Sequence, residues 1–255
     1  MRIAAIQHDI VWEDREANFE RCAGLIARAA GTGAELALLA ETFSTGFSMT
    51  PGIGERQGGP SSQFLIQQAR AHGVWVGATC PEVPDGALLP YNAFVLAGPD
   101  GTVHRYHKVH PFTYGGEHNR YVAGDRLVTV TIAGVRCSLF VCYDLRFAEE
   151  FWRLAPVTDV YLVPANWPAP RRLHWRALLQ GRAIENQAYV VGCNRVGSSP
   201  HDEYIGDSTI ISPLGEVLAT AAETESIVLA DVDPEIVADA RRRFRFMSDR
   251  RHVAR

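Results

Sequence analysis

Apolar residues along this chain occur in two patterns, short continuous runs and longer stripes with helical spacing. The stripe formed by Phe19, Cys22, Ala23, Ile26 and Ala29 predicts a helix, because residues three and four positions apart share one helix face. Short apolar runs bounded by turn residues predict buried strands instead. The predicted helices cover residues 15–30, 61–72, 146–154, 172–186 and 234–244. The predicted strands cover 3–7, 36–40, 74–79, 160–164, 189–193 and 227–232, and hairpins pair 93–97 with 102–106, 127–132 with 135–141, and 208–211 with 216–218.

The order of these elements predicts the fold class. Helices alternate with strands toward both ends of the chain, and the antiparallel hairpins lie between them. No stretch rich in Ser, Gly and Pro divides the sequence. We therefore predict a single α/β domain over residues 1–255, in which two mixed β-sheets pack face to face and helices cover the outside.

Composition narrows the possible partners and the compartment. The formal net charge of -4 gives no general attraction to nucleic acid or to an anionic membrane. No apolar stretch approaches the ~20 residues needed to cross a bilayer, and the N-terminus is too polar after Ile6 for a signal peptide. The five cysteines are scattered and include no C-x-x-C pair, which argues against a disulfide framework and a zinc ribbon. We expect a cytoplasmic protein that binds neither nucleic acid nor membrane.

Three histidines with regular spacing raise the question of a metal site. His104, His107 and His110 stand at three-residue intervals. In a strand, His104 and His107 point to opposite faces, and Pro111 discourages a helix that would bring them together. We therefore predict no metal site here and place His107 and His110 beside the entrance to an active site.

Cys142 lies where an apolar run ends and a polar segment begins, in S-L-F-V-C-Y-D-L-R-F. A cysteine between a strand and a helix is held at the edge of a sheet, where backbone N–H groups of the turn can bind an oxyanion. The alternative is a buried cysteine that acts as a small hydrophobic residue.

Two other strands end in the same way. Glu41 directly follows the apolar run A-L-L-A, and Lys108 follows the strand T-V-H-R-Y-H. Each could be a solvated strand end, but three reactive side chains at equivalent positions would converge if the strand ends share one edge. Glu41 could then take the proton of the Cys142 thiol, and Lys108 could stabilise the thiolate. Lys108 and the backbone N–H of Tyr143 would together form an oxyanion hole.

These residues and their neighbours resemble the nitrilase (carbon–nitrogen hydrolase) superfamily. Its Glu-Lys-Cys triad is similar to three segments of this chain, A-E-T-F around Glu41, Y-H-K-V-H-P-F around Lys108 and V-C-Y-D-L-R-F around Cys142. Within the superfamily, the ω-amidases resemble the chain further, at A-N-W-P (165–168) and H-W-R-A-L-L (174–179). The resemblance covers nearly the whole chain. It implies a four-layer αββα sandwich, no cofactor, commonly a homodimer, and hydrolysis of the terminal amide of 2-oxoglutaramate or 2-oxosuccinamate through a thioester.

The resemblance also places a second glutamate between the lysine and the cysteine. Glu117, in T-Y-G-G-E-H-N-R-Y, occupies that position and would orient Lys108 and help to position the substrate or the attacking water. A loop carboxylate paired with a nearby arginine is the alternative.

Several aromatic and basic residues are candidates for the substrate pocket. Trp167 follows a strand between Asn166 and Pro168, and a substrate that carries a carboxylate needs a cation. The candidate aromatic residues are Trp167, Phe43, Phe47, Tyr143, Phe112 and Tyr114, and the candidate cations are Arg146, Arg171 and Arg172. Packing against the core is the alternative for the aromatic residues, and a structural pair with Asp144 is the alternative for Arg146.

The C-terminal part, from about residue 234, is strongly basic and contains two phenylalanines. It is interpreted as a helix with a solvated cationic end, or as a tail that packs across a dimer.

Two other functions stay open at this point. One is the same triad acting on a nitrile, an N-carbamoyl amino acid or a deaminated glutathione, and the other is a catalytically silent binding protein with the same fold.

Overall fold

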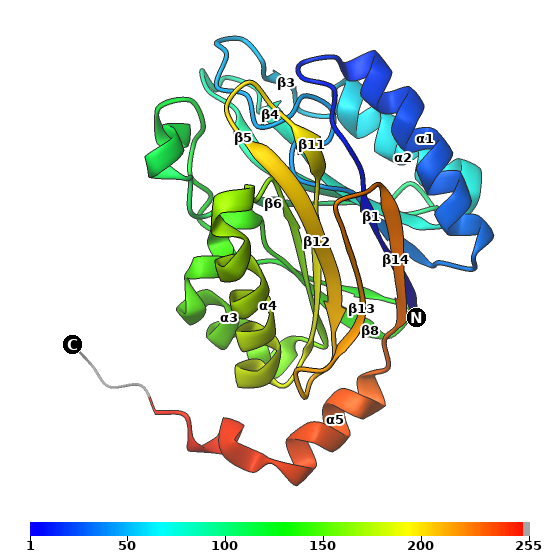
Figure 1. Ribbon diagram of the computed structural model, residues 1–255, viewed down its shortest axis with the longest axis vertical. Helices are drawn as coiled ribbons and strands as arrows, with labels where there is room; N and C mark the ends of the chain where they lie inside the picture. Colours follow the sequence, from blue (N-terminus) through cyan, green and yellow to red (C-terminus); the bar gives the residue numbers. More distant parts are fainter. Residues whose placement is uncertain (252–255) are drawn as a thin grey trace.

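The computed structural model describes residues 1–251, and these residues form two seven-stranded mixed sheets (Figure 1). The strand order is β14-β1-β2-β4-β5-β6 in the first sheet, with β3 on β4, and β11-β12-β10-β9-β8-β7 in the second, with β13 on β12. The first sheet contains β1 (Arg2–Gln7), β2 (Leu36–Leu38), β3 (Glu55–Arg56), β4 (Trp75–Val83), β5 (Tyr91–Ala97), β6 (Val103–His107) and β14 (Ser226–Asp231). The second contains β7 (Thr129–Ile132), β8 (Val135–Leu139), β9 (Val160–Ala165), β10 (Tyr189–Asn194), β11 (Val196–Ser198), β12 (Glu203–Ile211) and β13 (Val217–Ala222).

Helices cover the outer face of each sheet, and short 3₁₀ turns connect several elements. The helices are α1 (Arg15–Gly31), α2 (Pro60–His72), α3 (Ala148–Leu154), α4 (Arg172–Asn186) and α5 (Pro234–Arg243). The 3₁₀ turns are η1 (Thr113–Gly115), η2 (Glu117–Asn119), η3 (Cys142–Arg146), η4 (Ala155–Val157), η5 (Ala169–Arg171) and η6 (Arg245–Asp249).

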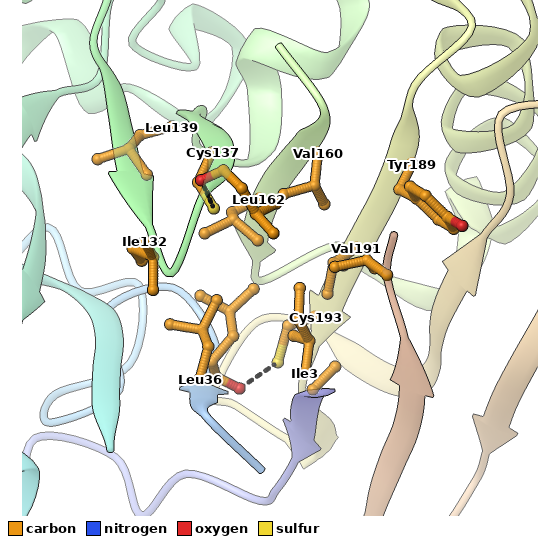
Figure 2. Packing of buried hydrophobic residues seen from close by; sticks show 14 of the residues in the cluster. Ile3, Leu36, Ile132, Cys137, Leu139, Val160, Leu162, Tyr189, Val191 and Cys193 are labelled. Carbon is orange, nitrogen blue, oxygen red and sulfur yellow. Dashed lines mark hydrogen bonds between the residues drawn. The ribbon is translucent and has the colours of Figure 1, made fainter. Parts of the chain in front are cut away.

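Three buried clusters hold these layers together. One lies between the two sheets, where Ile3 and Leu36 of the first sheet face Leu162 and Val191 of the second (Figure 2). A second fills the space between the first sheet and helices α1 and α2, and a third lies between the second sheet and helices α3 and α4. Strands covered on both faces need apolar residues at every position, which explains why they appear as continuous runs in the sequence. The predicted four-layer αββα sandwich is confirmed.

The sheet topology brings two of the strand ends to one edge. Strands β2 and β4 are parallel, whereas β5 is antiparallel to both β4 and β6. Strand β6 therefore runs in the same direction as β2, and the residues that follow these two strands, Glu41 and Lys108, leave the sheet at the same edge. Cys142 follows β8 in the other sheet.

Several boundaries differ from the predictions. Strand β8 ends at Leu139, and the predicted helix from Arg146 begins at Ala148, because residues 142–146 form the 3₁₀ turn η3. Strand β4 continues to Val83 through Pro81, and the short strand β11 was not predicted. Its residues Val196–Ser198 are few and partly polar, so no apolar run marks them.

The C-terminal segment packs on its own chain. Helix α5 lies at the end of the sandwich where β14 finishes (Figure 1). The side-chain amide of Gln187 donates to the carbonyls of Ala240 and Phe244, and Arg250 donates to the carbonyl of Glu185. The last four residues of the predicted domain and tail, 252–255, lie outside the described residues. Among the helices of residues 1–251, none is long and apolar enough to span a membrane.

Candidate active site

Glu41, Lys108 and Glu117 meet in the interior of the protein. The Lys108 Nζ atom lies 2.8 Å from Glu41 Oε1 and 2.9 Å from Glu117 Oε2. Glu41 and Glu117 are fully buried, and Lys108 is 1% exposed, so these strand ends are not solvated. A buried cluster of charges is costly unless it is paired, and here the two carboxylates share the one ammonium group of Lys108.

The charges of this cluster shift one another's proton affinities. Burial disfavours the ammonium group of Lys108, but the carboxylates of Glu117 and Glu41 outweigh burial and hold its pKa well above the usual value. Burial raises the pKa of Glu117, and the negative charge of Glu41 adds to this rise, while Lys108 opposes it. Lys108 therefore stays charged over the whole physiological pH range.

Cys142 begins the turn η3 with a left-handed backbone conformation, at φ 44°. A residue with a side chain adopts this conformation at a cost of about 1 kcal/mol or more, and such strain is found where a side chain must be aimed. Burial raises the pKa of the Cys142 thiol well above its usual value, and the charge of Glu41 and a hydrogen bond with it raise it further, while Lys108 opposes the rise. The thiol is therefore protonated at neutral pH and needs a base before it can act as a nucleophile.

Asp144 ties the turn of Cys142 to the strand of Lys108. Its carboxylate accepts hydrogen bonds from the Tyr106 hydroxyl at 2.7 Å and from the backbone N–H of His110 at 2.9 Å. It also accepts from the backbone N–H of Val141 at 3.0 Å. Tyr106 and His110 stand two residues before and two residues after Lys108, so this one buried carboxylate holds the two strand ends together.

Two asparagines that the sequence reasoning did not select contact Glu41. The backbone N–H of Asn166 donates to Glu41 Oε2 at 2.8 Å, and its side-chain amide donates to the Glu41 carbonyl. The side-chain amide of Asn92 donates to Glu41 Oε1 at 2.8 Å. The signal for Asn92 was a single amide within the apolar strand Y-N-A-F-V-L-A, where a buried polar side chain needs a partner.

A cavity of about 260 Å³ opens onto Cys142 and Glu41. Six residues predicted for the pocket line this cavity, and they are Phe47, Phe112, Tyr143, Trp167, Arg146 and Arg171. The guanidinium groups lie over aromatic rings, with Arg146 4.8 Å from the centre of Trp167 and Arg171 5.3 Å from that of Phe112. Within residues 1–251 neither guanidinium forms an ion pair with a carboxylate, and Arg146 instead contacts the ring nitrogen of His174.

The sequence reasoning missed one wall of the cavity. This wall comes from the loop before α1, from the loop that follows β2, and from the β11–β12 hairpin. Its residues are Trp12, Met49, Ser199, His201, Asp202 and Tyr204. Trp12 and His201 meet edge to face across 6.1 Å, which joins two of these segments. All of these residues except Tyr204 lie in loops, which carry no periodic signal, so only the folded chain brings them to the site.

Other predicted pocket residues lie elsewhere. Phe43 packs against Phe19 and Phe64 in the core, and Tyr114 is 87% exposed. Arg172, the first residue of α4, forms an ion pair with Asp207. These three residues do not line the cavity.

The three histidines are used in packing. His104 stacks on Trp75, His107 on Tyr91 and His110 on Phe147. His107 and His110, which we expected to flank the entrance, do not line the cavity. Among the residues that the structure describes, no three His, Cys, Asp or Glu side chains gather as metal ligands would.

In this αββα sandwich the thiol of Cys142 and the carboxylate of Glu41 line one cavity, and the ammonium group of Lys108 pairs with Glu41 behind it. The sequence model of carbon–nitrogen hydrolases matches residues 2–242, so the chain belongs to the carbon–nitrogen hydrolase family.

Similar proteins cover nearly the whole chain. Omega-amidase YafV of Escherichia coli (strain K12) is 39% identical over 96% of this chain and 93% of its own. A 2-oxoglutaramate amidase of Bacillus subtilis (strain 168) is 33% identical over 94% of this chain and 93% of its own. Among solved structures, a superfamily member from Xanthomonas campestris with an arsenic adduct in the active site is 32% identical, with a TM-score of 0.93 over 100% of this chain and 98% of its own.

Proposed function

We propose that this protein is an amidase that hydrolyses the terminal amide of small 2-oxo acid ω-amides, 2-oxoglutaramate and 2-oxosuccinamate, to the dicarboxylate and ammonia. The names of the relatives in Escherichia coli and Bacillus subtilis support this substrate class. The observation that carries the reaction type is that Glu41 and Cys142 line one cavity while Lys108 forms a buried ion pair with Glu41.

The first half of the reaction forms a thioester. The Sγ atom of Cys142 attacks the amide carbon while Glu41 takes the thiol proton, since the raised pKa of the thiol leaves no preformed thiolate to attack. The carbonyl oxygen becomes an oxyanion, which Lys108 and the backbone N–H of Tyr143 stabilise. That N–H lies in the first turn of η3, where the helix itself offers no acceptor. The C–N bond then breaks, and Glu41 returns the proton to the leaving ammonia.

The second half releases the acid. Water attacks the thioester carbon while Glu41 accepts one of its protons, and the oxyanion forms in the same place as before. The C–S bond breaks, the Cys142 sulfur regains a proton from Glu41, and the dicarboxylate leaves. Glu117 orients Lys108 throughout, because both of its carboxylate oxygens accept hydrogen bonds from the Lys108 ammonium.

The far end of the substrate carries a carboxylate, and two cations of the cavity are available to bind it. Arg146 and Arg171 line the cavity, and within the described residues neither is neutralised by an ion pair. Phe47, Phe112 and Trp167 enclose the short carbon chain between the amide and the carboxylate. A volume of about 260 Å³ favours a small substrate over a peptide.

Ammonia release from 2-oxoglutaramate tests this function, in the wild type and in Cys142→Ala. We expect the variant to lose turnover and the acyl adduct that mass spectrometry detects on the wild-type cysteine. Cys137→Ala is the matched control, because Cys137 is buried on β8 and does not line the cavity. Equal rates in wild type and Cys142→Ala would refute the nucleophile. Turnover of a nitrile, an N-carbamoyl amino acid or deaminated glutathione in place of 2-oxoglutaramate would refute the substrate class, and no turnover with intact folding would favour a binding protein.

The compartment and the assembly belong to the same proposal. All five cysteines are free thiols, which supports a reducing compartment such as the cytoplasm. Apolar side chains on the outer face of α4 and near β13, among them Leu173, Leu214 and Val217, are exposed and support a homodimer. Phe244 and Phe246 expose further apolar surface beside the C-terminal helix. Sedimentation equilibrium tests the assembly, and a mass equal to one chain at micromolar concentration would refute it.

A further inference from the structure

Asn92 lies at the centre of the charged cluster although it carries no charge. It stands on β5 and is 1% exposed, and its backbone carbonyl accepts a hydrogen bond from the backbone N–H of Lys108 at 3.0 Å. Its side chain therefore starts from the strand next to β6 and reaches the same group of atoms as the Lys108 side chain.

The two side chains contact the same two oxygen atoms. The Nδ2 atom of Asn92 donates to Glu41 Oε1 at 2.8 Å and to Glu117 Oε1 at 3.0 Å. Lys108 Nζ donates to these same atoms at 2.8 Å and 3.1 Å. Two donors and two acceptors thus alternate around a closed ring. Both hydrogens of the Asn92 amide are used within it.

The orientation of the Asn92 amide is determined by this ring. If the amide were turned over, its Oδ1 atom would face two carboxylate oxygens, and like partial charges would repel one another. In the observed orientation, Asn92 Oδ1 is buried and has no hydrogen-bond partner among residues 1–251. A buried carbonyl without a partner destabilises the fold, typically by about 1–3 kcal/mol. The bonds of Nδ2 to the two carboxylates therefore fix the orientation of the amide.

A neutral donor meets a specific need here. Two buried carboxylates share one ammonium group, so their mutual repulsion favours uptake of a proton by one of them. A second cation would remove the repulsion but would also weaken Glu41 as a base. An amide supplies one hydrogen bond to each carboxylate, which favours the ionised form without adding a charge.

We propose that Asn92 is a positioning residue for the general base, which aims the Glu41 carboxylate at the Cys142 thiol and keeps Glu117 at a fixed distance from it. This inference rests on the proposed function, in that it takes Cys142 as the nucleophile and Glu41 as its base. Titratable groups surround Glu41 from several elements. They are Lys108 after β6, Glu117 in η2, Tyr121 after η2, Cys142 in η3 and, on β12, Tyr204.

The test measures the rate at which iodoacetamide alkylates Cys142, as a function of pH, in the wild type and in Asn92→Ala. Alkylation needs no amide substrate, so it reports the thiol and its base directly. At low pH a carboxylate base is protonated and cannot take the thiol proton, so the alkylation rate falls. This fall toward low pH is the acid limb of the rate profile. We expect Asn92→Ala to move this limb about one unit to higher pH, which lowers the rate about tenfold on the acid side.

Three further variants make the result specific. Asn92→Asp adds a third carboxylate to the ring and is expected to move the acid limb further than Asn92→Ala. Asn92→Ser retains one donor, is expected to give a smaller shift, and serves if the alanine variant does not fold. Asn186→Ala is the matched control, because Asn186 is also fully buried but bonds to Arg182 at the end of α4. It is expected to lose stability and to keep the wild-type limb.

The outcomes separate this inference from the proposed function. An unchanged acid limb in the Asn92 variants, with ammonia still released from 2-oxoglutaramate by the wild type, would overturn the role of Asn92 and leave the proposed function standing. A shifted limb in a protein that releases no ammonia from ω-amides would support the role of Asn92 and refute the substrate class. A shift of the same size in Asn186→Ala would also overturn the inference, because it would reflect a general loss of stability.

Discussion

The hydroxyl of Tyr106 donates a hydrogen bond to Asp144 across 2.7 Å, and this contact joins the two halves of the site. Tyr106 belongs to β6 of the first sheet, and Asp144 belongs to the turn η3 that follows β8 of the second. Each lies two residues from a group that takes part in the proposed reaction, Lys108 in one case and Cys142 in the other. Burial and the charge of Asp144 raise the pKa of Tyr106 well above its usual value, so the hydroxyl remains a donor at every physiological pH.

Removing this hydroxyl should misalign the site more than it weakens the fold. We predict that Tyr106→Phe loses about 1.5–3 kcal/mol of unfolding free energy, as expected for one buried hydrogen bond to a charged group. We also predict a decrease in kcat of about tenfold or more, because Lys108 and Cys142 are no longer held in register. Tyr161→Phe is the control, since it deletes a buried hydroxyl that donates to the Phe151 carbonyl away from the cavity. Equal kcat losses in the two variants would contradict the prediction.

Glu117 should matter through the ammonium group that it contacts. In Glu117→Gln one of the two negative charges beside Lys108 is removed, and the pKa of Lys108 should fall toward its ordinary value, because Glu117 is the strongest of the groups that raise it. We predict a decrease in kcat of about 10- to 1000-fold in the folded protein, as when oxyanion stabilisation is impaired. Steady-state kinetics with 2-oxoglutaramate measures it. Glu82→Gln, which disturbs the Arg105 pair in the same sheet, should leave kcat near wild type.

The two cavity arginines should recognise the substrate carboxylate. We predict that Arg171→Met or Arg146→Met raises KM for 2-oxoglutaramate about 10- to 100-fold, since a hydrogen bond to a charged group contributes about 1.5–3 kcal/mol. A neutral amide of similar length has no carboxylate to lose, so its KM should change little. Arg176→Met, which replaces an exposed arginine on α4, is the control. Parallel changes for the charged and neutral amides would argue against carboxylate recognition.

His8 should make the stability of the protein depend on pH. Burial lowers the pKa of this fully buried histidine from 6.5 to about 4, and its Nε2 atom accepts a hydrogen bond from the backbone N–H of Ala40. Below pH 6.5 the unfolded chain binds a proton at His8 that the folded chain binds only near pH 4. The contribution of neutral His8 to the unfolding free energy is therefore complete above pH 6.5, and it decreases as the pH falls toward 4.

The expected size of this effect is a loss of about 2 kcal/mol of unfolding free energy between pH 7.5 and 5. Urea denaturation at the two pH values measures it. In His8→Gln the unfolding free energy should be lower at pH 7.5, but its difference between the two pH values should shrink by about this amount. His118→Gln replaces an exposed histidine and should keep the wild-type difference. An unchanged difference in His8→Gln would show that other groups cause the pH dependence.

The sequence allowed the prediction of the elements that carry the site, because buried strands need continuous apolar runs and a break in such a run marks a strand end. Glu41, Lys108 and Cys142 stand at such breaks. In the structure Glu41 and Cys142 line one cavity, and Lys108 pairs with Glu41. The sequence alone left each of them with a second interpretation. Burial removes the solvated-end interpretation for Glu41 and Lys108, and burial is a property of the folded chain.

Cys142 shows how local detail depends on tertiary contacts. The apolar run predicts a strand as far as Val141, but β8 ends at Leu139 and the cysteine begins a 3₁₀ turn with positive φ. The carboxylate of Asp144 accepts hydrogen bonds from the backbone N–H groups of Val141 and of His110, which follows β6 in the other sheet, and these bonds hold the turn. Such a contact between residues distant in sequence leaves no periodic pattern.

Local apolar patterning governs the order of helices and strands and the two-sheet architecture, so the sequence alone determined them. The same patterning placed Glu41, Lys108 and Cys142 at strand ends. The tertiary structure decided the rest of the site. It placed Asn92 between two carboxylates, and it brought Trp12 and His201 together at the cavity wall. The physical reason is that these contacts depend on the register between strands and on the packing of one sheet against the other, and both arise only when the chain has folded.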